Sequence, residues 1–82
     1  MGTFIGEGID LVSVNKKLVA YHIGRLKDKN VSVRLKSILE LKELGDPDAL
    51  TALQEVYKGD IDAEVRKAAQ EAGRAIFLKN QK

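Results

Sequence analysis

The sequence predicts an all-α fold of four helices in two antiparallel pairs, arranged as a short α-α superhelix or compact helical bundle. Three observations predict it: apolar residues recur at helical spacing, capping residues separate these stretches, and one pattern of residues returns after 32 positions. The two copies of the pattern read Leu18, Tyr21, Asp28, Val33, Arg34, Ser37, Leu41, Leu44 and Leu50, Leu53, Asp60, Val65, Arg66, Ala69, Gly73, Ile76. A repeat of this length is typical of solenoids, in which each unit buries its apolar face against the next.

The chain divides into an N-terminal segment, residues 1–9, and a single helical domain over residues 10–82. We expect the segment to be flexible or docked on the domain. The first helix is expected within residues 10–26, and one line along it should face the core. That line consists of Leu11, Leu18, His22 and Leu26, with Val14 and Tyr21 beside it.

The second helix is expected over residues 31–44. Asn30 is a suitable N-cap, and Gly45 can take the left-handed conformation that ends a helix. The apolar stripe of this helix is Val33, Ser37, Ile38, Leu41 and Leu44. These residues follow the helical period, so the stripe predicts the buried face.

The third helix is expected over residues 47–58, with Asp46 as its N-cap and Pro47 in its first turn, where a missing N–H costs nothing. The fourth is expected over residues 63–78, after the N-cap Asp62. Their apolar residues are Leu50, Leu53 and Tyr57 in the third and Val65, Ala69, Ala72 and Ile76 in the fourth. Connections of a few residues predict that consecutive helices run antiparallel.

Composition excludes several classes of protein. The chain has no cysteine, which rules out disulfides and thiolate metal sites. No apolar run approaches the length of a membrane span, and the start of the chain lacks the features of a signal peptide, so we expect a cytoplasmic protein. The 14 basic and 12 acidic side chains are interspersed, which gives only weak support to nucleic-acid binding.

The residues of the first copy resemble a known family. The run from Asp28 to Arg34, with the turn Gly45-Asp46 that follows, resembles the HEAT-like repeat of the phycobilisome-lyase type. The residues that carry the repeat signature are Val33, Arg34, Gly45, Asp46, Val65 and Arg66. The resemblance implies an arginine that pairs with the aspartate of a neighbouring turn, and it suggests Arg34 with Asp46. Phe77 and Leu78 stand where the next Gly-Asp is expected, so the pattern predicts that the repeat array stops there.

A candidate binding face lies on the second and fourth helices. Leu35 and Leu39 are large apolar residues on the side of the second helix that points away from its core stripe. The face consists of Leu35, Leu39 and Lys42, with Lys67, Glu71 and Arg74 at the equivalent positions of the fourth helix. A small apolar centre among charges is typical of a protein-binding patch. Two alternatives remain: residues 1–9 cover the leucines, or the leucines form a homodimer contact.

Other functions have less support from the sequence. His22 is the single histidine and is more typical of a packed residue than of a base or metal ligand, so we expect no enzyme, metal or cofactor. The aspartates of the turns, Asp46, Asp48, Asp60 and Asp62, are best explained as helix caps. Nucleic-acid binding would use Lys36, Lys42, Lys67 and Arg74, which Glu43, Glu64 and Glu71 interrupt. A further alternative is an accessory subunit of a larger enzyme or pigment–protein assembly.

Overall fold

The computed structural model describes residues 11–81. These residues form the helices α2 (Leu11–Arg25), α3 (Val31–Leu44), α4 (Leu50–Gly59) and α5 (Ala63–Lys79), and the 3₁₀ turn η1 (Pro47–Ala49) precedes α4. The prediction of four helices is confirmed. The expected bounds of the second helix are those observed for α3, and the expected third helix consists of η1 followed by α4.

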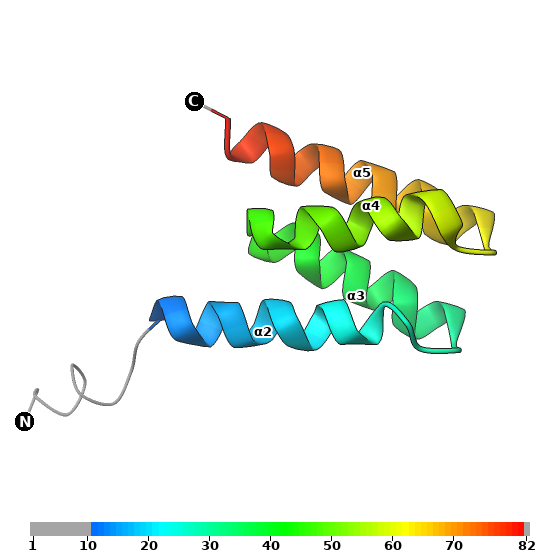
Figure 1. Cartoon of the computed structure of the whole chain (residues 1–82), viewed down its shortest axis with the longest axis horizontal. Coiled ribbons are helices and arrows are strands. Elements are labelled where there is room, and N and C mark those ends of the chain that lie inside the picture. Colours follow the sequence, from blue (N-terminus) through cyan, green and yellow to red (C-terminus); the bar gives the residue numbers. More distant parts are fainter. Residues whose placement is uncertain (1–10, 82) are drawn as a thin grey trace, which may run out of the picture.

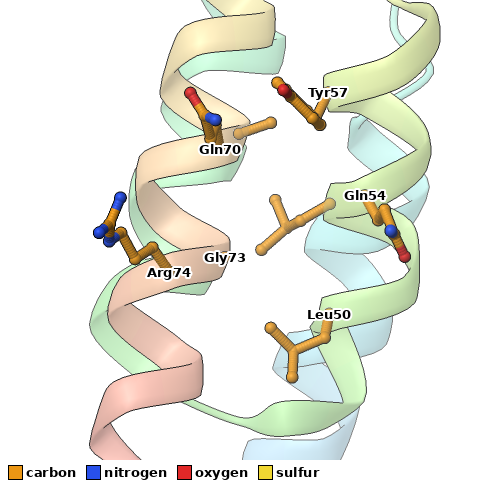
Figure 2. Close-up of a pocket in the computed structure, with 8 residues that line it drawn as sticks. Leu50, Gln54, Tyr57, Gln70, Gly73 and Arg74 are labelled. Carbon is orange, nitrogen blue, oxygen red and sulfur yellow. The ribbon is translucent and has the colours of Figure 1, made fainter.

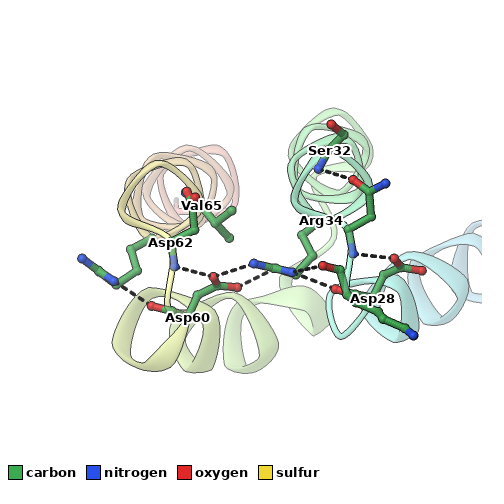
Figure 3. A network of polar contacts seen from close by, with 9 residues as sticks. Asp28, Ser32, Arg34, Asp60, Asp62 and Val65 are labelled. Carbon is green, nitrogen blue, oxygen red and sulfur yellow. Dashed lines mark hydrogen bonds and ion pairs between the residues drawn. The ribbon is translucent and has the colours of Figure 1, made fainter.

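The helices form two antiparallel pairs, α2 with α3 and α4 with α5 (Figure 1). Figure 3, which looks along the helices, shows α2 and α4 in one layer and α3 and α5 in the other. Within a layer the helices run in the same direction (Figure 1). Helix α3 packs against both α2 and α5, so it joins the two pairs.

The predicted capping residues determine where the helices begin and end. Asn30 accepts a hydrogen bond from the Ser32 N–H at 2.8 Å, and Asp62 accepts one from the Val65 N–H at 3.0 Å. Gly45 has φ 65°, the left-handed conformation, and its N–H bonds to the Leu41 carbonyl at 3.0 Å. Asp46 caps η1 through the Asp48 N–H at 2.8 Å, and Pro47 is in the first turn as predicted.

One aliphatic core holds the helices together. Its fully buried members come from every helix and from η1: Val19, Leu26, Ile38, Leu41, Ala49, Leu53, Val65, Ala69, Ala72 and Ile76. The predicted stripes of α3 and α5 supply most of them. Arg34 and Ser37 are the buried polar residues among those described.

The prediction for the buried face of the first helix was right for Leu26, which is buried, but wrong for Leu18, which is 41% exposed. Val19 is buried in its place and Ile23 packs against the core, whereas Tyr21 is 58% exposed. Val14 is 44% exposed and His22 is half-buried, while the side chain of Leu11 lies outside what the structure describes.

The buried residues of this first segment do not follow the repeat of 32 positions. Val19, Ile23 and Leu26 lie 30 positions before Ala49, Leu53 and Val56, which pack in the same core. Two positions correspond to about 200° of rotation around a helix, so aligning both copies at 32 positions turned the predicted face of this helix away from the core.

Candidate functional site

The predicted binding residues lie on the side of α3 and α5 that is turned away from α2 and α4. Lys42, Lys67, Glu71 and Arg74 are exposed, and Leu39 is 57% exposed. On α5, Leu78 lies four residues after Arg74 and seven after Glu71, which places it on the same face. It is 57% exposed. We call Leu39, Lys42, Lys67, Glu71, Arg74 and Leu78 the outer face.

A hydrogen bond at the C-terminal ends of α3 and α5 sets the register of the outer face. The side-chain amide of Asn80 donates to the Gly45 carbonyl at 3.0 Å and to the Ile76 carbonyl at 2.8 Å. Because α3 and α5 run in the same direction and rise equally per residue, this bond places Leu39 at about the level of Arg74. The apolar centre on α3 and the charges on α5 are thus neighbours across one surface.

Leu35 does not belong to the exposed part of this surface. It is half-buried and packs against the core. The expectation that it points away from the core is corrected, and the reason lies in α3. This helix is contacted by both α2 and α5, so its buried arc is wider than that of a helix packed on one side.

Leu78 was missed as a surface residue. The sequence interpretation used Phe77 and Leu78 only as a sign that the repeat ends. The spacing of Leu78 from Glu71 and Arg74 was the signal that could have placed it on the outer face. The alternative that residues 1–9 cover this face concerns a segment outside the described residues.

Arg34 pairs with a different aspartate from the one that the resemblance suggested. Its Nε and Nη2 donate to the two carboxylate oxygens of Asp60 at 2.8 and 3.0 Å, and its Nη1 donates to the Asp28 carbonyl at 2.8 Å (Figure 3). Asp46 follows the other end of α3, about 18 Å farther along the helix axis. The antiparallel course of the chain brings Asp60, and not Asp46, to the beginning of α3.

The pair is buried, and its surroundings favour the charged forms. The side chains of Arg34 and Asp60 are 9% and 8% exposed. Burial alone would raise the pKa of Asp60. The N–H of Asp62 and the Arg34 guanidinium outweigh it, so the pKa of this carboxyl lies below its usual range. This arrangement fixes the two helix pairs relative to each other, so both side chains have a structural role.

Asp46 takes part in an exposed contact instead. The Nζ of Lys16 lies 3.0 Å from Asp46 and 2.8 Å from Asp48, which links α2 to the start of η1. The Asp48 N–H, together with Lys16, lowers the pKa of Asp46 despite partial desolvation. The hydrogen bonds from Asp48 and Asp46 raise the pKa of Lys16. Three of the four predicted capping aspartates therefore accept backbone N–H bonds, and Asp48 pairs with a lysine.

A hollow of about 220 Å³ opens between α4 and α5 on the side away from α2. Leu50 reaches toward it from α4, and Gly73 leaves the opposite wall open (Figure 2). Arg74 lines its rim but its guanidinium points away. The lining is mostly apolar and offers no titratable pair, so it resembles a packing surface more than a catalytic pocket.

The described residues contain little that could support catalysis or metal binding. No group of three or more histidines, aspartates or glutamates within residues 11–81 is placed to hold a metal ion. The Nδ1 of His22 is buried without a hydrogen-bond partner in this part of the chain, beside Tyr21, whose ring centroid is 5.0 Å away. None of the helices formed by these residues has the length and apolar character needed to cross a membrane.

The family comparison agrees with this architecture. The model of HEAT repeats matches residues 9–73, which is most of the chain. No curated protein and no solved structure matches the sequence significantly. HEAT repeats commonly mediate contacts between proteins. The two stacked helix pairs, the Arg34–Asp60 link between them and the extent of the match together show that this chain belongs to the HEAT repeat family.

Proposed function

We propose that the protein is a non-enzymatic adaptor or scaffold that binds another protein through the outer face. The observation that carries the proposal is Leu39, a large apolar side chain that is 57% exposed amid charged residues of α3 and α5. Apolar centres with polar rims are typical of protein interfaces.

The outer face is suited to a complex of modest affinity. Burying Leu39 and Leu78 would contribute on the order of 3 kcal/mol, before the costs of ordering the partners are subtracted. Lys42, Lys67 and Arg74 surround the leucines with more positive than negative charge, since Glu71 is the one acidic member of the face. A partner with an acidic rim would therefore associate faster and with greater specificity.

The finer features of the proposal rest on the sequence. A phycobilisome-lyase type of HEAT repeat, a role as accessory subunit of a larger assembly, and a cytoplasmic location all remain predictions. Of the predicted binding residues, Leu35 contributes through packing beneath the surface rather than through exposed area.

The test is a comparison of two variants that each place one glutamate on an exposed apolar side chain. Leu39→Glu alters the outer face, and Ile61→Glu alters the turn before α5, where Ile61 is 92% exposed. The proposal predicts that Leu39→Glu loses a protein captured by the wild type, while Ile61→Glu retains it. Both variants should keep the wild-type melting temperature. Equal capture by Leu39→Glu would contradict the proposal.

Nucleic-acid binding is the competing function, because Lys36, Lys42, Lys67 and Arg74 are all exposed on this side of the molecule. Binding to mixed DNA and RNA that weakens steeply with salt would favour it. The interspersed glutamates make us expect no such binding at physiological salt.

A further inference from the structure

Both ends of the two-pair stack expose apolar side chains among residues 11–81. At one end, α2 exposes Val14, Leu18 and Tyr21, which lie along one line of the helix opposite its buried line. We call these three residues the first end face. Helix α2 is thus apolar on two sides, a pattern typical of helices covered on both sides. Arg25 lies over the ring of Tyr21, 5.9 Å from its centroid, and Tyr21 is still 58% exposed.

At the other end, Tyr57 lines the hollow between α4 and α5 and is 43% exposed. Phe77 lies one turn after Gly73 on α5 and is 55% exposed. Gly73 lacks the side chain that would fill the hollow, and a Cβ at Gly73 would meet no atom within 4 Å. We call Tyr57, Gly73 and Phe77 the second end face. The second end face is concave, and Tyr21 of the first end face also borders a hollow, which lies between α2 and α3.

The polar contact that joins the two pairs has two parts, and one of these parts is also found in the second pair. The Nη1 of Arg34 donates to the Asp28 carbonyl at 2.8 Å, and the Nη1 of Arg66 donates to the Asp60 carbonyl at 2.7 Å. These contacts are equivalent and 32 positions apart. Arg34 also binds the Asp60 carboxylate of the next pair, but the remaining N–H groups of Arg66 meet no acceptor within residues 11–81. The sequence contains no aspartate after Asp62.

Asp28 is the matching acceptor at the other end. Its Oδ1 accepts the Asn30 N–H at 2.8 Å, as the Oδ1 of Asp60 accepts the Asp62 N–H at 2.9 Å, so the two aspartates have the same setting. Asp60 also binds an arginine of the preceding pair through two short hydrogen bonds. Among the described residues, the ion pair of Asp28 is with Arg25 at the end of α2, at 3.7 Å. Within residues 11–81, Arg66 therefore lacks the carboxylate partner that Arg34 has, and Asp28 lacks the two short arginine bonds that Asp60 has, at opposite ends of the stack.

We propose that a second copy of this chain stacks end to end on the first, with Arg66 of one copy bound to Asp28 of the next. The first end face of the second copy then covers the hollow at Gly73. This repeats between chains the contact that Arg34 and Asp60 make within one chain. The two surfaces differ, so the interface is heterologous, and further copies can add in the same way.

The test uses two full-length variants that each block one end. Leu18→Glu with Tyr21→Glu blocks the first end face, and Gly73→Glu places a charged side chain in the hollow of the second. We expect the average mass of the wild type to exceed 9.0 kDa in light scattering and to increase with concentration past that of a dimer. Each blocked variant alone should remain at 9.0 kDa, and an equimolar mixture should form a dimer that grows no further.

A charge exchange in this mixed dimer tests the polar connection. In the variant with the blocked first end, Arg66→Glu should weaken the dimer about tenfold. Adding Asp28→Lys to the other variant should restore most of the affinity. Circular dichroism of each variant alone checks that it is folded. No recovery by the exchange would overturn the role of Arg66 and Asp28.

Other results would overturn the proposal as a whole. They are a wild type that stays at 9.0 kDa up to about 1 mM, a mass that levels off at a dimer, and a mixture that stays monomeric. A large fall in the melting temperature of Leu18→Glu with Tyr21→Glu would show that the chain's own residues cover the first end face. Leu39→Glu is the control and should assemble like the wild type, so failure here leaves the proposed use of the outer face untouched.

Discussion

The guanidinium of Arg34 connects three segments of the chain: α3, the turn before it and the turn before α5. Arg66 has the equivalent place in the second pair, but within residues 11–81 its guanidinium makes only the bond to the Asp60 carbonyl. The substitution of arginine by lysine keeps the charge and removes the planar fork that binds both carboxylate oxygens. We predict that Arg34→Lys lowers the free energy of unfolding by about 2 kcal/mol and that Arg66→Lys lowers it by less than about 1 kcal/mol. Urea denaturation measures both, and equal losses would contradict the structure.

The pH dependence of the free energy of unfolding provides a control for the role of the Arg34–Asp60 pair. The pKa of Asp60 is lowered from its usual value of 3.8 in the folded state, so below about pH 4 the unfolded chain binds more protons at this site. The contribution of Asp60 to stability is therefore complete at neutral pH and is lost as the pH falls through the folded-state pKa. The difference in stability between the wild type and Asp60→Asn should shrink on acidification.

Helix α5 contains a glycine in its middle, which a packed helix seldom favours. A Cβ at Gly73 would meet no atom within 4 Å, so the space allows alanine. Glycine in a helix interior costs about 1 kcal/mol relative to alanine. We predict that Gly73→Ala raises the free energy of unfolding by about this amount, measured by urea denaturation at a concentration where the chain is monomeric. A loss of stability would contradict this prediction, because it would mean that a Cβ at Gly73 is not accommodated in α5.

The elements were predicted well wherever a cap and a stripe agreed. For α3, Asn30, Gly45 and the apolar period all indicated the same bounds, and the structure has those bounds. For α2 the period alone was ambiguous, because the helix carries apolar residues on two sides. Which side is buried depends on how α2 packs against the rest of the molecule, and the period along one helix cannot reveal this.

At the scale of the whole molecule, the sequence predicted the exposed residues of the outer face except Leu78, and it did not predict the partner of Arg34. Local spacing determines which side of a helix a residue occupies, and this placed Leu39 and the surrounding charges correctly. The choice between Asp46 and Asp60 depends on which turns meet in three dimensions. Likewise, Leu35 is partly covered because two neighbouring helices contact α3, and spacing along α3 alone cannot reveal this.

The single core predicts how the whole molecule unfolds. Helix α3 packs on α2 and on α5, and the buried cluster includes residues of every helix, so neither pair keeps an intact core without the other. The chain has two tyrosines and no tryptophan, and Tyr21 and Tyr57 lie one in each pair. Tyr21→Phe and Tyr57→Phe therefore leave a single tyrosine whose fluorescence reports on one pair.

We predict that both variants show the same urea midpoint by fluorescence and that circular dichroism gives this midpoint as well, as expected for a two-state domain. Both tyrosines are partly exposed, and phenylalanine preserves their rings, so neither substitution should shift the midpoint appreciably. Measurements at low concentration keep the chain monomeric and separate folding from stacking. If Tyr21 reported an earlier transition than Tyr57, the pair of α2 and α3 would unfold independently. The Arg34–Asp60 link and the shared core would then be too weak to make the two pairs one cooperative unit.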